Sequence, residues 1–509
     1  MELNQQNRNF STSTIVLDTV AEQLADVDFT LPDYCPDIEK ILKCTLTPKV
    51  QSKNLSGGQL RIDGYCIVNV LYVENINKTI RCCEQSVSFS QCFTVKETPD
   101  NAVIITKTKQ EYINCRALSP RRLVMHGAFS LYAKVFATDS KNIYVPDNEN
   151  LECLKKAVRC ADLKAFCQEQ FNVCEEINVA DKPKIESILY STVTATIIDS
   201  KAVTGKLMVN GETNISIFYL CNVETGESGK IDYVIPFNQI IDCEGVDENT
   251  VNCIQCSIMS YDLRLKNDLV NENPSIVVDI KICVSEEGYI LQDEEIICDA
   301  YSVKYAVGQE KEQVSMLSEI QPINETFIQK MNIHTDDGKI SKVLDIYCDS
   351  VTSESRITDK GAEVFGKINI CMLALNNDEY PIFIDRTAEY EHPVSQATDC
   401  NALKNINSQI SSVSYRMSAD DEVEIRCELK VSAVAIKEEQ YEVIKSIEVY
   451  EDKELPCEKC ALTLYYASKG ENLWNIAKSH RTKLDMLLEE NSTEQMVLEN
   501  AQMLLIPRV

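Results

Sequence analysis

The sequence has few basic residues and no long apolar run. Its 50 lysines and arginines are outnumbered by 79 aspartates and glutamates, which gives a formal net charge of −29 over 509 residues. No basic block is longer than the pair Arg121-Arg122. Nucleic acids and anionic membrane surfaces are bound mainly through clustered positive charge, so we exclude both as partners. No stretch approaches the ~20 apolar residues of a membrane span, so we expect no membrane insertion.

Residues that carry catalysis or metal binding are also scarce. No HExxH, GxSxG or nucleotide-binding string accompanies the histidines, and we expect no catalytic role for them. A zinc site needs four converging ligands, and only two cysteine pairs have the spacing of half a site. Cys253 and Cys256 lie in a predicted strand, where they would point to opposite faces; the pair in a charged connector, Cys457 and Cys460, is the better candidate. The sequence therefore predicts no metal and no cofactor. The four histidines are His126, His334, His392 and His480.

The N-terminus is polar and lacks the basic start and apolar core of a secretory signal, so we expect the protein to stay in the cytoplasm. The chain has 23 cysteines, an odd number spread along its whole length. A chain of this size does not need disulfides to stabilise its core. We therefore expect mostly reduced thiols, with later oxidation in an assembly left open.

Residues 55–59 read Leu-Ser-Gly-Gly-Gln, the string with which ABC-type ATPases close on nucleotide. Such an enzyme also needs a phosphate-binding loop in which a lysine is followed by Ser or Thr. The nearest string, Gly361 to Lys367, is followed by Ile368, which cannot hold magnesium. Both strings fall at one recurrent polar connection of a repeated pattern. We therefore predict β-turns there and no ATPase activity.

Three copies of one sequence pattern fill most of the chain. Segments 38–42, 185–189 and 340–344 have apolar residues at i, i+3 and i+4, which predicts one short helical turn in each copy. Each segment is followed at a matching distance by a glycine inside an apolar run. Alternating apolar and polar residues rich in β-branched side chains then indicate half-buried strands. The three glycines are Gly64, Gly211 and Gly366.

We therefore predict mainly β, β-sandwich-like domains in series, each with a short helix, followed by a small α+β domain. The predicted boundaries are a polar tail at 1–13, three repeats at 14–160, 161–315 and 316–449, a linker at 450–461, and the last domain at 462–509. Within this last domain, residues 462–467 and 503–506 predict two strands. Asn472 predicts the N-cap of a helix from Leu473 to about His480. Thr482 to Asp485 is similar to a capping box and predicts a second helix with Leu484, Leu487 and Leu488 on one face.

The tail, residues 462–509, resembles a LysM domain in its βααβ order and in the segments Tyr465 to Ala477, Leu484 to Asn491, and Leu504 to Pro507. LysM domains generally bind N-acetylglucosamine polymers such as peptidoglycan. This sequence departs from the family at Glu471-Asn472 and at Asn500-Ala501, in the two loops that flank the sugar groove of the family. Without an export signal, the module would not reach the wall by the usual route, which favours a cytoplasmic protein ligand.

The repeats resemble the SPOCS domain of spore-coat proteins, most clearly at Leu31 to Leu42 and Ala117 to Leu123. Together with the LysM-like tail, this resemblance implies a non-enzymatic morphogenetic scaffold that binds the coat ATPase SpoIVA through the tail. It would act in the mother-cell cytoplasm at the forespore surface, and the repeats would contact other coat proteins. The alternative is a peptidoglycan-binding protein of the spore cortex or cell wall.

The only tryptophan, Trp474, lies in the first helix of the tail, one step from the predicted buried stripe. A domain this small would not bury it fully, and partly exposed large aromatic side chains are frequent binding hot spots. We therefore predict a protein-binding surface around it; a tryptophan that only caps the core is the alternative. The predicted surface residues are Leu462, Lys469, Gly470, Glu471, Asn472 and Trp474.

Overall fold

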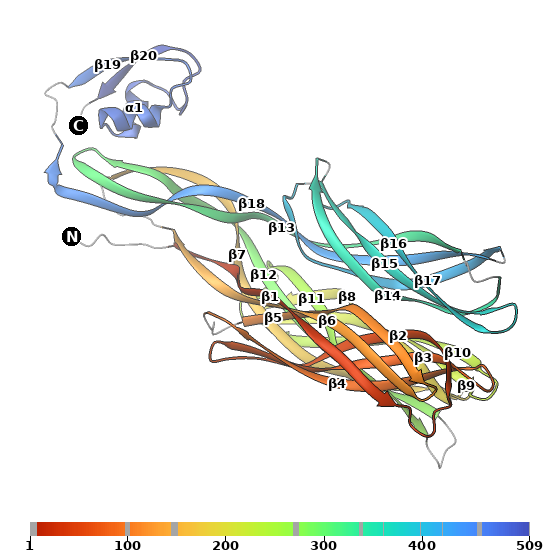
Figure 1. Ribbon diagram of the computed structural model, residues 1–509. Helices are drawn as coiled ribbons and strands as arrows, with labels where there is room; N and C mark the ends of the chain where they lie inside the picture. The colour runs from red at the N-terminus through yellow and green to blue at the C-terminus, as the bar shows by residue number, and fades with distance from the viewer. Residues whose placement is uncertain are drawn as a thin grey trace.

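Three β-sandwiches of six strands each are followed by a small α+β tail in the computed structural model (Figure 1). In every sandwich the first strand pairs with the sixth, which also pairs with the fifth, and the second, third and fourth strands form the facing sheet. This shared strand order confirms the prediction of three β-rich repeats. The structure describes residues 8–96, 102–143, 151–267, 274–334, 339–359, 361–397, 399–419, 421–455 and 461–507.

The bounds of the strands show how closely the three sandwiches correspond. The first consists of β1 (Arg8–Thr30), β2 (Ile38–Ser56), β3 (Gln59–Glu74), β4 (Ile80–Thr94), β5 (Ala102–Ser119) and β6 (Arg122–Ile143). The second consists of β7 (Leu151–Asn178), β8 (Ser187–Val203), β9 (Lys206–Asn222), β10 (Glu227–Asp242), β11 (Val251–Asn267) and β12 (Pro274–Ser302). The third consists of β13 (Tyr305–His334), β14 (Ile340–Thr358), β15 (Gly361–Asn376), β16 (Pro381–Val394), β17 (Ala402–Ala419) and β18 (Glu422–Glu454).

The predicted short helices in the repeats are wrong: segments 38–42 and 340–344 are the beginnings of strands with bulges, and in segment 185–189 the strand β8 begins at Ser187. In β2 the register shifts between Ile38 and Lys40 and again between Ile41 and Lys43. The same two shifts occur in β14, and β8 has the second of them. Each bulge adds one residue to a strand with a side-chain period of two. Closely spaced bulges therefore produce an apolar spacing of three that imitates a helix.

The repeated glycines lie opposite an aromatic ring on the neighbouring strand. Gly64 pairs with Phe89, and Gly211 pairs with Phe237 in the second sandwich. A Cβ atom on Gly64 would lie 2.6 Å from the ring of Phe89, and one on Gly211 would lie 2.2 Å from the ring of Phe237. The ring thus occupies the space that a side chain on the glycine would fill. This packing explains why each copy carries a glycine inside an otherwise apolar strand.

The sandwich boundaries differ from the predicted ones, because the first strand of each repeat begins earlier than the helix-like segment suggested. The positions 160/161 and 315/316 fall inside β7 and β13, and the predicted linker includes the end of β18. The long ends of β7, β12, β13 and β18 extend beyond the sandwiches and pack on one another through apolar clusters. We call this extension the arm; it comprises residues 151–163, 289–302, 305–320 and 434–454.

In each sandwich, the sheet of the second, third and fourth strands contributes to one apolar cluster, where the three sheets meet. Equivalent positions of the three repeats lie in this cluster. Leu71 of β3, Phe218 of β9 and Leu373 of β15 lie in this cluster. Ion pairs join the sandwiches around it: Lys43 Nζ lies 2.6 Å from Asp385 Oδ2, and Lys230 Nζ lies 2.9 Å from Asp345 Oδ1. Tyr190 also donates a hydrogen bond to Asp345. The repeats therefore form one packed body instead of separate domains on a string.

The tail has the predicted order of strand, helix, helix and strand. It consists of β19 (Leu462–Ala467), α1 (Leu473–His480), α2 (Leu484–Glu490) and β20 (Gln502–Pro507), with β19 and β20 antiparallel. The predicted capping box is wrong: the N-cap of α2 is Lys483 and makes no side-chain bond. The backbone N–H of Thr482 bonds to the carbonyl of Ala477 and so belongs to the end of α1. No helix in the described ranges is long and apolar enough to span a bilayer.

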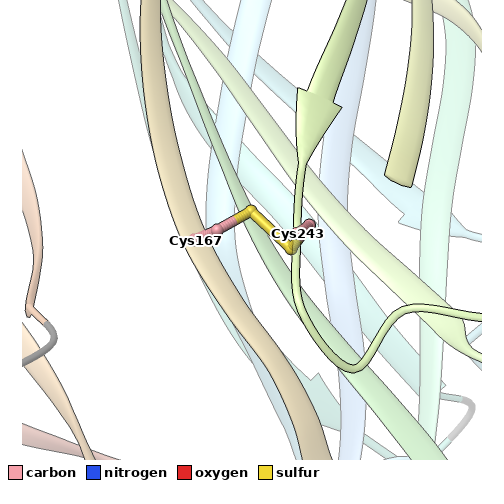
Figure 2. Close-up of a disulfide and its surroundings, with 2 residues drawn as sticks. All are labelled: Cys167 and Cys243. Atoms are coloured by element: carbon pink, nitrogen blue, oxygen red, sulfur yellow. A yellow bond between two sulfur atoms is a disulfide. The ribbon is translucent and has the colours of Figure 1, made fainter. Parts of the chain in front are cut away.

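One disulfide corrects the expectation of reduced thiols for a single pair of cysteines. Cys167 of β7 is bonded to Cys243, which directly follows β10, so the bond links the two sheets of the second sandwich (Figure 2). The other described cysteines are free. The bond closes a separation of 76 residues. Closing a loop of that length stabilises the folded state by about 4 kcal/mol in the chain-entropy model.

Thiol titration of the denatured, unreduced protein should detect at least two fewer reactive thiols than the 23 cysteines of the chain. Peptide mapping after alkylation should then find Cys167 and Cys243 unmodified and joined. Replacing Cys243 by Ala should release one additional thiol, that of Cys167. Detection of every cysteine as a free thiol in the wild-type protein would contradict the bond.

Candidate protein-interaction surface

The inner face of the two-stranded tail sheet forms the tail core with α1 and α2. Leu504 and Ile506 of β20 pack with Leu473 and Ala477 of α1, and all four side chains are buried. The side chain of Asn472 accepts a hydrogen bond of 2.8 Å from the backbone N–H of Trp474, which confirms the predicted N-cap. The cap fixes the start of α1 directly after the turn that follows β19.

The outer face of the same sheet is apolar and open. Three residues of β19, spaced two apart, point to this face: Leu462 is 50% exposed, Leu464 66% and Tyr466 68%. On β20, Met503 pairs directly with Tyr466 and is 62% exposed. A folded protein normally buries such a continuous group of large apolar side chains, so this face indicates a binding surface. We call these four residues the tail face.

The turn after β19 and the segment that precedes β20 are bonded to each other through their backbones. The backbone N–H of Gly470 donates to the carbonyl of Leu498 over 2.8 Å, and the N–H of Leu498 donates to Glu471 over 3.0 Å. The N–H of Leu473 bonds to Met496 over 2.9 Å. Backbone groups engaged in this way are not free to bind the hydroxyl and acetamido groups of a saccharide.

Trp474 is not on an open surface, contrary to the sequence prediction. Its side chain is only 2% exposed, because residues of β12 cover it. The ring of Tyr301 meets the indole edge-on with 4.9 Å between centroids. The indole Nε1 donates a hydrogen bond of 2.9 Å to Asp299 Oδ2. The tail is indeed too small to bury its tryptophan alone, and the arm of the same chain supplies the missing contact.

The other predicted surface residues have different positions. Lys469 and Gly470 are exposed in the turn after β19. Glu471 is half-buried and accepts a hydrogen bond of 3.1 Å from the hydroxyl of Tyr465. Leu462 alone belongs to the tail face; Asn472 acts as a helix cap. The prediction missed Leu464, Tyr466 and Met503. The sequence did indicate two of them, because large apolar residues occur at both even and odd positions of segment 462–467, which point to opposite faces of a strand.

The first nucleotide-like string lies at a hairpin turn, as predicted, whereas the second lies in a strand and not at the predicted β-turn. Residues 57 and 58 form the two-residue turn between β2 and β3, and both glycines have positive φ, 57° and 75°. The corresponding turn lies between β8 and β9. Gly361 to Lys367 is part of β15, so its backbone is extended and pairs with β14 and β16. An extended, paired backbone cannot wrap around phosphates as a loop does.

The remaining candidate residues for chemistry do not come together. Among the described residues, no three His, Cys, Asp or Glu side chains converge as metal ligands would. Cys253 and Cys256 lie on β11 as expected, and Cys457 and Cys460 are outside the described residues. The four histidines are distributed over β6, β13, β16 and α1. His392 bonds to Glu325 over 2.8 Å, and His126 bonds to Asp26 over 3.2 Å.

Comparison with known proteins supports the interpretation of the repeats. No curated protein and no solved structure was found to match the chain. The third sandwich has the same strand order as the first two, although the matching segments lie only in those two. The matching family model is described as the SipL, SPOCS domain and covers residues 37–118 and 184–266. These segments contain nearly all of β2 to β5 and of β8 to β11. The match suggests that this chain, with its SipL-like SPOCS repeats, is a sporulation-related protein.

Proposed function

We propose that the chain is a non-enzymatic adaptor of spore-coat assembly, whose tail binds the coat ATPase SpoIVA. The observation that carries the proposal is the tail face, an open group of four large apolar side chains on a two-stranded sheet. The name of the matching family, SipL, agrees with a role in sporulation. The packed body of three sandwiches would serve as the scaffold, with further coat proteins as ligands of the repeats.

A protein partner fits the tail face better than a glycan does. The exposed side chains of Leu462, Leu464 and Met503 carry no hydrogen-bonding group, and a saccharide needs several of them. Burial of large apolar side chains is instead the usual source of affinity at the centre of a protein interface. The strongly acidic chain would work in the mother-cell cytoplasm at the forespore surface, where SpoIVA would be its anchor.

Replacing Tyr466 by Glu should weaken binding of SpoIVA by about 30-fold or more, because hot-spot residues contribute about 2 kcal/mol or more. Met503→Glu should have a similar effect, since the two side chains are directly opposite. Affinity would be measured by calorimetry with the full chain, and folding by circular dichroism.

Ile240→Glu provides the matched control. Ile240 is 54% exposed on β10 and lies far from the tail in sequence, so this variant makes the same chemical change on another strand surface. We expect it to bind SpoIVA as the wild type does. Wild-type affinity in both folded tail-face variants would refute the proposed surface.

A further inference from the structure

The tail is attached to the arm by a contact that centres on one carboxylate. Asp299 of β12 accepts hydrogen bonds from Trp474 Nε1 at 2.9 Å and from Lys478 Nζ at 2.7 Å to each carboxylate oxygen. Gln309 of β13 donates to the same group at 3.0 Å. Trp474 and Lys478 are four residues apart on α1 and therefore share one face of the helix. Asp299 thus joins one face of α1 to two strands of the arm.

A second contact fixes the other end of α1. The hydroxyl of Tyr301 donates a hydrogen bond of 2.7 Å to the backbone carbonyl of Thr482, just beyond the helix. Tyr301 is 5% exposed, and it belongs to the same apolar cluster as the tail core. Two contacts at the two ends of an eight-residue helix determine its orientation as well as its position. We call the set of Asp299, Tyr301, Trp474, Lys478 and Thr482 the joint.

The joint and the tail face lie on opposite sides of the tail. One face of α1 contacts the arm, another packs on the inner face of the β19–β20 sheet, and the tail face is the outer side of that sheet. Figure 1 shows α1 between the arm and the two strands. The backbone N–H of Leu455, next to β18, bonds to Lys304 over 2.9 Å, which keeps the start of the connection at the tip of the arm. The short connection keeps the tail at high effective concentration near the joint.

We propose that Asp299 and Tyr301 are positioning residues that hold the tail with its apolar face directed away from the arm. Trp474 acts in this joint and does not contact the partner. The inference builds on the adaptor function proposed above and assigns the arm a role in it. A partner then meets a tail face that is already oriented relative to the body, so less orientational freedom is lost on binding.

The intrinsic fluorescence of Trp474 tests the joint directly, because it is the only tryptophan in the chain. Replacing Asp299 by Ala in the full chain should shift its emission to longer wavelength and increase quenching by acrylamide severalfold, as the indole becomes hydrated. Asp293→Ala, an exposed acid on the same strand, is the control and should leave the emission unchanged. Emission and quenching of folded Asp299→Ala equal to those of the wild type would overturn the joint, whatever the partner does.

A double-mutant cycle separates positioning from partner contact. Asp299→Ala and Trp474→Phe should each weaken SpoIVA binding severalfold, which is a smaller loss than that of Tyr466→Glu. The double variant should bind SpoIVA no more weakly than the single variant with the lower affinity. If the loss of affinity in the double variant equals the product of the two single losses, Trp474 contacts the partner and the positioning role is overturned. If Tyr466→Glu binds normally while Asp299→Ala shifts the emission, the adaptor surface fails and the joint stands.

Discussion

Glu286→Gln should stabilise the protein by about 4 to 5 kcal/mol at pH 8 or above and by less than about 1 kcal/mol at pH 5. Glu286 of β12 is 0% exposed, and neither carboxylate oxygen has a hydrogen-bond partner. It faces Cys167 on β7 and Ile254 on β11. Burial, with a smaller effect from the charge of Glu287, raises the pKa of Glu286 from 4.5 to about 8. A shift of one pKa unit corresponds to about 1.4 kcal/mol.

The sign of the effect follows from proton binding. Between the unfolded pKa of 4.5 and the folded pKa of about 8, the unfolded chain loses the proton of Glu286 while the folded chain keeps it. The free energy of unfolding of the wild type therefore falls as the pH rises through this range. Glutamine has the same shape and cannot ionise, so it removes this contribution.

Urea unfolding at several pH values would measure the difference between the two proteins. Glu295→Gln is the matched control, because Glu295 lies on the same strand with 60% of its side chain exposed. We expect its effect to stay within about 0.5 kcal/mol at every pH. A constant difference between wild type and Glu286→Gln from pH 5 to pH 8 would contradict the assignment of a neutral, buried carboxyl group.

Gly366→Ala should destabilise the third sandwich by about 3 kcal/mol or more. A Cβ atom at this position would lie 1.8 Å from the backbone oxygen of Thr352 and 3.1 Å from the ring of Tyr390. Two backbones that are already hydrogen-bonded must then separate, which is costlier than the rotation of a side chain. The substitution tests whether the repeated glycine is a packing requirement of the SPOCS-like repeats.

Lys367→Ala is the matched control for Gly366→Ala. Lys367 is the next residue on β15, and 63% of its side chain is exposed. Its replacement should change the free energy of unfolding by less than about 0.5 kcal/mol. A Gly366→Ala protein within 1 kcal/mol of the wild type would show that the strands accommodate the methyl group.

The sequence predicted the parts of the fold that depend on local periodicity. Alternation of apolar residues identified the strands after Gly64, Gly211 and Gly366, and the spacing of Leu473, Ile476 and Ala477 identified α1. The same reasoning misread segment 38–42, because two bulges in one strand produce the apolar spacing of a helix. Periodicity alone does not distinguish these two causes of a three-residue spacing.

The candidate site was only partly predictable, because its contacts cross long distances in the chain. Asp299 and Trp474 are 175 residues apart, and no local pattern indicated that the arm would cover the tryptophan. The arm itself consists of the ends of four strands that extend beyond the sandwiches. The sequence places Leu464 and Tyr466 in a strand. Only the register in which this strand pairs with β20 shows that they share an exposed face with Met503.

Calorimetric titration of the full chain with SpoIVA, with and without an N-acetylglucosamine oligomer, tests the central claim most directly. We expect SpoIVA to bind with a negative heat-capacity change, as burial of the apolar tail face requires. We also expect the oligomer neither to bind nor to compete. Binding of the oligomer at the tail without binding of SpoIVA would contradict the adaptor function and would favour a protein of the cell wall or spore cortex.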